Sequence, residues 1–127
     1  FMKKLLFVLA LTLLSVASYA QTKYIRTVDL TIGIKNDKTV DWNPPSQESM
    51  LIQIDDHVMV IYSKIVQTFR VIKYDGEFKD GVKRWYCVDK DNLTCNIYIS
   101  QPDKVTKKIS VGVEYNDLAY YYTGYQE

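Results

Sequence analysis

The side chains that could carry chemistry are few, and the most suggestive group surrounds the only histidine. His57 follows Asp55 and Asp56, residue types that can bind a metal or move a proton. The flanking segments have the pattern of strands, in which neighbouring side chains point to opposite faces, so Asp55 and Asp56 cannot both face one ion. No second histidine is present to complete a common zinc set. We therefore predict no metal site and place His57 at a strand start beside a polar turn.

A second group of acidic residues belongs to two Asp-Gly dipeptides and the segment between them. Asp75, Glu77 and Asp80 offer oxygen ligands, but their order is not that of a calcium-binding loop, and Asp-Gly is ordinary turn chemistry. The chain has no Gly-x-Ser-x-Gly elbow, and no spacing among its acids singles out a catalytic pair. We predict that the protein is not an enzyme and uses no cofactor.

The two cysteines, Cys87 and Cys95, are placed symmetrically about Asp91. A short loop centred on Asp91 puts them directly opposite each other on two antiparallel strands, with Trp85 opposite Ile97 on the same side. Because an even cysteine count is typical of disulfides in exported proteins, we predict a Cys87–Cys95 bridge.

The start of the chain indicates that compartment. Lys3 and Lys4 precede a short apolar run, and Ser18-Tyr19-Ala20 has the small-x-small form of a signal-peptide cleavage site. We expect residues 1–20 to be removed, leaving residues 21–127 as a single domain in the periplasm or outside the cell, with no membrane span. The leader resembles those of small exported proteins of the Bacteroidetes type.

Charge excludes one class of partner. The whole chain has 16 basic and 15 acidic residues, and the leader holds Lys3 and Lys4 and no acid. The remaining chain is therefore close to neutral, with 14 basic and 15 acidic residues. Nucleic-acid binding needs a basic face, so we predict no nucleic-acid partner.

The remainder of the sequence predicts an all-β fold. Apolar and polar residues alternate in short runs that are separated by turn-forming residues, which is the pattern of strands in an antiparallel meander. About eight strands are expected, and they can close as an up-and-down barrel or, alternatively, form a β-sandwich. The expected strands fall near residues 27–34, 50–54, 57–62, 65–74, 82–89, 93–100, 107–115 and 118–124. Residues 41–46, which contain two prolines, are expected to be a loop.

The last two expected strands show which aromatic residues face outward. With Asn116 and Asp117 as a two-residue turn, Tyr120 and Tyr122 share the core face, and Tyr121 lies outside, opposite Gly112. Tyr125 also points outward in this register.

The segment of residues 50–62 has two apolar faces. One carries Met50, Ile52, Ile54, Met59 and Ile61, and the other carries Leu51, Gln53, Val58, Val60 and Tyr62 on a hairpin that turns at Asp55 and Asp56. A meander strand normally has one solvated face, so something should cover the second. The loop that carries Trp42 can fold over Val58 and Val60 as a lid, or the face can bind a partner.

These patterns favour a small exported bacterial binding module or inhibitor that acts on a protein or a glycan through exposed aromatic residues. The candidate binding residues are Trp42, Leu51, Val58, Val60, Tyr62, Tyr121 and Tyr125. The alternative is a structural component that self-associates through the apolar hairpin face. A small-ligand carrier is the third possibility and requires a hollow barrel. The sequence leaves the oligomeric state open.

Overall fold

The structure, a computed structural model, describes residues 22–127, and the predicted leader and its cleavage site lie outside these residues. The described chain is built from antiparallel strands, and no helix in it has the length and apolar composition of a membrane span. The strands are β1 (Lys23–Lys35), β2 (Val40–Trp42), β3 (Ser46–Gln47), β4 (Leu51–Ile54), β5 (Val58–Tyr62), β6 (Gln67–Glu77), β7 (Lys83–Val88), β8 (Thr94–Ile99), β9 (Ile109–Glu114) and β10 (Leu118–Gln126).

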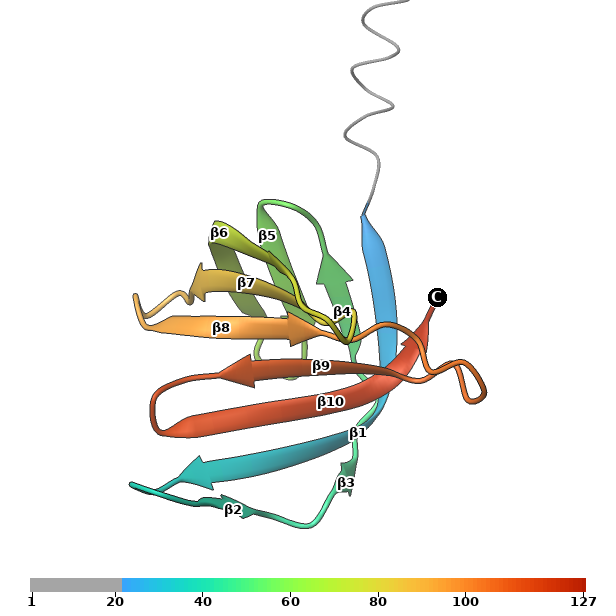
Figure 1. Cartoon of the computed structure of the whole chain (residues 1–127). Coiled ribbons are helices and arrows are strands. Elements are labelled where there is room, and N and C mark those ends of the chain that lie inside the picture. The colour runs from blue at the N-terminus through green and yellow to red at the C-terminus, as the bar shows by residue number, and fades with distance from the viewer. Residues whose placement is uncertain (1–21) are drawn as a thin grey trace, which may run out of the picture.

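Eight of these strands close into an up-and-down barrel, as predicted, and the sandwich alternative is wrong. Strands β4 to β10 pair in chain order, and β1 joins the two ends of this meander by pairing with both β4 and β10 (Figure 1). The two extra strands, β2 and β3, come from the stretch that was predicted to be a loop, and both pair with β1.

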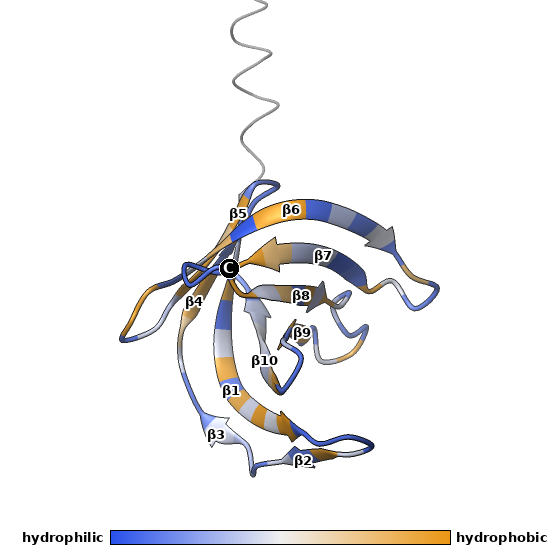
Figure 2. Cartoon of the chain, turned by 90° about the vertical axis from the view of Figure 1, so that its left-hand side faces the viewer, coloured by the Kyte–Doolittle hydropathy of each residue, from blue (hydrophilic) through white to orange (hydrophobic). Residues whose placement is uncertain are grey.

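Strand β1 is shared between the barrel and this extension. Its first four residues pair with β4 on one edge, and the same edge then pairs with β3 and β2, while β10 pairs along the other edge. The register with β10 shifts between Thr27 and Asp29, which makes Val28 an irregular position in the strand. This bulge changes which residues point inward, from Ile25 and Thr27 before it to Leu30 after it. The alternation of apolar and polar residues along β1 is visible in Figure 2.

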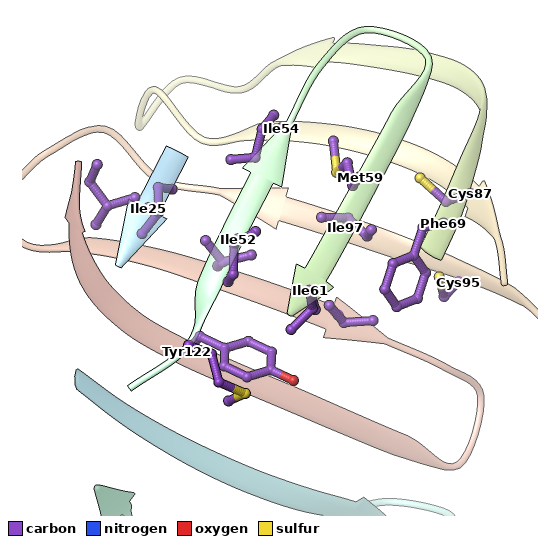
Figure 3. Close-up of a cluster of buried hydrophobic side chains, with 14 residues drawn as sticks. Ile25, Ile52, Ile54, Met59, Ile61, Phe69, Cys87, Cys95, Ile97 and Tyr122 are labelled. Carbon is purple, nitrogen blue, oxygen red and sulfur yellow. The ribbon is translucent and has the colours of Figure 1, made fainter. Parts of the chain in front are cut away.

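Side chains fill the middle of the barrel. One contiguous buried cluster contains residues from β1, β4 to β10 and the segment before β4 (Figure 3). Its members are Ile25, Met50, Ile52, Ile54, Met59, Ile61, Phe69, Cys87, Cys95, Ile97, Ile109, Val111, Val113 and Tyr122. The predicted inward face of residues 50–61 is confirmed, and Tyr120 packs against the cluster.

The β9–β10 hairpin has the predicted register. Tyr121 pairs with Gly112, and the Tyr115 N–H donates to the carbonyl of Leu118. The β4–β5 turn instead lies one residue further along than predicted, because Ile54 pairs with Met59 and the Asp55 N–H donates to the carbonyl of Val58 at 3.1 Å. The Asp55 carboxylate causes this shift, since it accepts the backbone N–H groups of His57 and Val58 and so closes the turn around itself.

The buried hydroxyl of Thr27 holds β1 to the segment that leads into β4. Thr27 is 1% exposed, and its Oγ1 donates to the carbonyl of Glu48 at 2.6 Å while accepting the Met50 N–H at 2.9 Å. The Thr27 N–H donates to the Met50 carbonyl. This one residue therefore satisfies three backbone groups at the point where β4 stops pairing with β1.

Replacing Thr27 with valine keeps the shape of the side chain but leaves a buried N–H and a carbonyl without partners. We expect Thr27→Val to lower the free energy of unfolding by about 1–3 kcal/mol, measured by urea denaturation. Thr31→Val, on the outer face of the same strand, is the control and should stay within about 0.5 kcal/mol of the parent. Equal effects of the two substitutions would show that the hydrogen bonds of the Thr27 hydroxyl make no special contribution to stability.

The cysteines lie where the sequence placed them, but the predicted disulfide is wrong. Cys87 and Cys95 are paired across β7 and β8, with Trp85 opposite Ile97, yet both are free buried thiols. The Asp89 N–H donates to the carbonyl of Leu93, so Asp89 and Leu93 form a hydrogen-bonded pair. Because the two types of pair alternate along antiparallel strands, Cys87 and Cys95, two positions away, also form a hydrogen-bonded pair. Side chains lie farther apart in this type of pair than in the other type, which disfavours the Cβ separation of about 3.5–4.5 Å that a disulfide needs.

Burial also makes these thiols unreactive. Burial raises the pKa of Cys87 to about 12 and that of Cys95 to about 11, so neither provides thiolate at neutral pH. We expect a thiol reagent at pH 8 to react slowly with the native protein and to find two thiols once the protein is denatured without reductant. Finding no thiol in the denatured, unreduced protein would mean that a bridge exists after all.

Candidate functional site

The predicted binding residues are divided between two separate areas of the outer barrel wall. Trp42 and Tyr121 lie together on one area, and their ring centroids are 5.2 Å apart. The second area holds Tyr125 and the hairpin residues Leu51, Val58, Val60 and Tyr62. Strand pairing brings them together, because Tyr62 pairs with Leu51, Leu51 with Arg26, and Arg26 with Tyr125. The sequence did not anticipate this division.

Trp42 is positioned by a bare glycine. It is the last residue of β2 and pairs with Gly33 of β1, which has no side chain to separate the strand from the indole. A Cβ atom added to Gly33 would lie 2.7 Å from the Trp42 ring, so the ring rests directly on the backbone. Trp42 meets Tyr121 edge to face, at an interplanar angle of 60°, and remains 51% exposed.

Tyr121 is positioned by a second bare glycine on the next strand. Its ring covers Gly112 of β9, where an added Cβ atom would lie 2.6 Å from the ring. The Tyr121 hydroxyl donates to the Glu114 carboxylate, and Lys35 Nζ lies 3.7 Å from the other oxygen of that carboxylate. Burial, and then the bond to Glu114, raise the pKa of Tyr121 above its ordinary range, so the hydroxyl stays protonated as a donor.

Beyond Gly112 the wall is hollowed, and Tyr98 of β8 stands on the far side. Tyr98 pairs with Gly112, and the hollow has a volume of about 400 Å³. Its lining consists of Val82, Tyr98, Ser100, Ser110, Gly112, Glu114 and Tyr121. We call Trp42, Tyr121, Tyr98 and Glu114, with the hollow that the last three line, the aromatic platform. It offers ring faces and edges, hydroxyl groups and one carboxylate at an open surface.

The predicted lid over the hairpin is wrong. Trp42 packs against Gly33, seven residues along β1 from Arg26, which is the residue that pairs with Leu51. At about 3.3 Å per residue this is about 23 Å along the strand. The cause is the pairing of β2 with the later part of β1, an arrangement that local sequence patterns do not specify.

The second area, which we call the apolar wall, therefore stays uncovered within the described chain. Its aromatic members are Tyr62, Tyr125 and Tyr24, which are 44%, 40% and 38% exposed, and Leu51, Val58 and Val60 are half-buried between and beside them. Two polar contacts cross it. The Tyr62 hydroxyl donates to Gln53 at 2.8 Å, and Arg26 Nε lies 3.0 Å from Glu127 Oε1.

Each end of the barrel also has a cavity. At the Asp55 mouth a cavity of about 210 Å³ is lined by Lys23, Ile25, Ile54, Asp55, Asp56, Lys83, Trp85, Ile99, Ser100, Gln101, Pro102, Ile109 and Gln126. At the Asp89 mouth, the opposite end, the cavity has a volume of about 460 Å³. In residues 22–127 no three His, Cys, Asp or Glu side chains are placed to hold a metal together.

Sequence reasoning missed Tyr98, Glu114 and Gly33 as parts of one site. Tyr98 belongs to a strand that is followed by a long connection, residues 100–108, so its register opposite Gly112 could not be worked out. The available signal was the presence of two glycines, Gly33 and Gly112, inside expected strands and near aromatic residues that were expected to be exposed.

Comparisons of this chain with models of protein families, with curated proteins and with solved structures found no match.

Proposed function

We propose that this protein is an exported bacterial binding module that holds a glycan chain on its aromatic platform. The observation that carries the proposal is the arrangement of Trp42 and Tyr121. Each ring rests on a bare glycine, the two rings are in contact, and the indole remains half exposed. Tyr121 also lines a hollow that has a carboxylate in its wall.

The chemistry of this surface suits a sugar. A pyranose ring has an apolar face of C–H bonds that can lie against an aromatic ring, and hydroxyl groups around its edge that need polar partners. The faces would come from Trp42 and Tyr98, and the acceptors from the Glu114 carboxylate and the Ser100 and Ser110 hydroxyls. Because the chain without its leader is close to neutral, dispersion and desolvation at the rings would supply most of the affinity, which favours an uncharged glycan.

We propose binding without catalysis at this site. Glu114 is the only carboxylate among the residues that line the hollow, and it is already paired with Tyr121 and Lys35. Glycoside hydrolysis ordinarily uses two carboxyl groups on either side of the scissile bond.

Substitution of Trp42 tests the proposal. Insoluble polysaccharides (cellulose, xylan, starch, mannan, chitin) would be used to capture the purified protein, and affinity for the one retained would be measured by depletion. We expect Trp42→Ala to weaken that binding at least about tenfold, as for an aromatic hot spot. Because the ring is half exposed, the cost in stability should be about 1–2 kcal/mol, below the ~3–5 kcal/mol of a buried aromatic.

Tyr62→Ala is the matched control, since it removes an exposed aromatic side chain from the apolar wall instead. It should leave glycan binding unchanged. Retention of no polysaccharide by the parent protein, or equal weakening by both substitutions, would contradict the proposal.

The apolar wall supports a second candidate, self-association as part of an assembly. Its specific support is that Leu51, Val60 and Tyr62 form an apolar stripe on the outside of the barrel, next to Tyr24 and Tyr125, with no cover from the rest of the described chain. Exposed apolar groups that lie together are typical of contact surfaces.

A charge at the centre of this wall separates the two candidates. If the wall joins two copies, Val60→Asp should convert a dimer to a monomer on a sizing column while the circular dichroism spectrum is kept. Val40→Asp, at an exposed position on β2 outside the apolar wall, is the control and should leave the elution volume unchanged. A parent protein that elutes as a monomer at high concentration would rule the assembly out.

A further inference from the structure

The Asp89 mouth of the barrel forms a cavity that neither candidate function uses. The buried cluster ends there at Phe69, which is 1% exposed, and the space above it has a volume of about 460 Å³. Small-molecule sites commonly have volumes of about 300–1,000 Å³, and the mouth of a β-barrel is one of their usual places. The filled barrel means that an occupant would rest on Phe69 and not pass deeper.

Several of the side chains that line this cavity are apolar although water can reach them. Ile65, in the connection between β5 and β6, is 68% exposed, and Leu93, in the β7–β8 turn, is 58% exposed. Leu118 and Tyr120 line the cavity from β10. Three segments far apart in the sequence thus bring apolar groups to one opening, and a ligand with an apolar body would remove them from water.

The charged residues that line this cavity are mostly acidic. Asp89, Asp91 and Asp117 line the cavity, and Lys90 is the one cation among the residues that line it. The Asp89 carboxylate is committed to structure, because it accepts the N–H groups of Asp91 and Leu93 and the Tyr115 hydroxyl, each at 2.9 Å. Among the described residues, the carboxylates of Asp91 and Asp117 make no hydrogen bond or ion pair, so they are available to a cation.

We propose that the Asp89 mouth is a binding site for a small organic amine with a compact apolar body. The body would lie against Phe69, Leu118 and Tyr120 under the rim formed by Ile65 and Leu93. The ammonium group would face the unpaired carboxylates of Asp91 and Asp117. An anionic ligand with the same body would meet like charge at the rim. This site lies at the end of the barrel and is independent of the aromatic platform on its wall.

Two probes of matched shape test the sign of the charge. 1-Naphthylmethylamine, a cation at pH 7, and 1-naphthylacetate, an anion, would each be titrated into the mature protein by calorimetry. We expect the amine to bind with a dissociation constant in the micromolar range and the carboxylate to bind at least about tenfold more weakly. Failure of the amine to bind at millimolar concentration, or equal binding of the two probes, would overturn the proposal.

Two pairs of substitutions test the location. Ile65→Ser removes an apolar group from the rim and should weaken amine binding about fivefold. Ile72→Ser removes a 52% exposed isoleucine that does not line the cavity, and should have no effect. Asp117→Asn should weaken the amine about threefold and leave the anion no weaker, while Asp56→Asn, at the other mouth, should change neither.

Leu118→Trp would fill the cavity and should abolish binding of the amine in protein whose circular dichroism spectrum is unchanged. If the amine still binds to this folded variant, or if each control substitution weakens binding as much as its partner, the probe occupies another place and the assignment is wrong. Glycan capture by the same variants is measured separately. Failure of the amine to bind at this mouth would therefore have no bearing on the proposed glycan site.

Discussion

The architecture depends on the closure of the barrel by β1. A meander of seven strands leaves two open edges, and β1 satisfies both by pairing with β4 and β10. The closure is tight. A Cβ atom added to Gly124 would lie 2.2 Å from the carbonyl oxygen of Arg26, so β10 can approach β1 only because this residue is glycine. Near the same place the Thr27 hydroxyl forms hydrogen bonds with the segment before β4. The pairing of β4 with β1 can therefore end there without leaving buried backbone groups unpaired.

This closure also explains where the candidate site lies. Because β1 is longer than β4, its later half has a free edge, and β2 pairs with that edge and carries Trp42 to the outer wall. There the bare backbones of Gly33 and Gly112 allow Trp42 and Tyr121 to lie close against the sheet. The inside of the barrel is occupied by packed side chains, so surfaces for recognition are left on the wall and at the two mouths.

The sequence predicts the parts of this structure that depend on neighbours along the chain. Period-two patterns give the strands, and the short turns give the facing of Tyr121 on Gly112 and of Cys87 on Cys95. What it does not predict depends on contacts between distant segments. The bulge at Val28 belongs to the pairing of β1 with β10. The strands β2 and β3 and the place of Trp42 follow from the pairing of those two strands with the other edge of β1, and no local pattern specifies either pairing. The missing disulfide depends on pair type, which alternation alone does not reveal.

The chain contains two tryptophans. Trp42 lies on the aromatic platform, and Trp85 lines the Asp55 mouth, so each tryptophan reports on a different surface. Their indole N–H groups give two separate signals in a ¹⁵N correlation spectrum of the labelled protein. On addition of a soluble fragment of the retained polysaccharide, the signal of Trp42 should shift progressively with concentration while that of Trp85 stays in place. A shift of Trp85 alone, or of neither signal, would contradict recognition of a glycan by the outer wall.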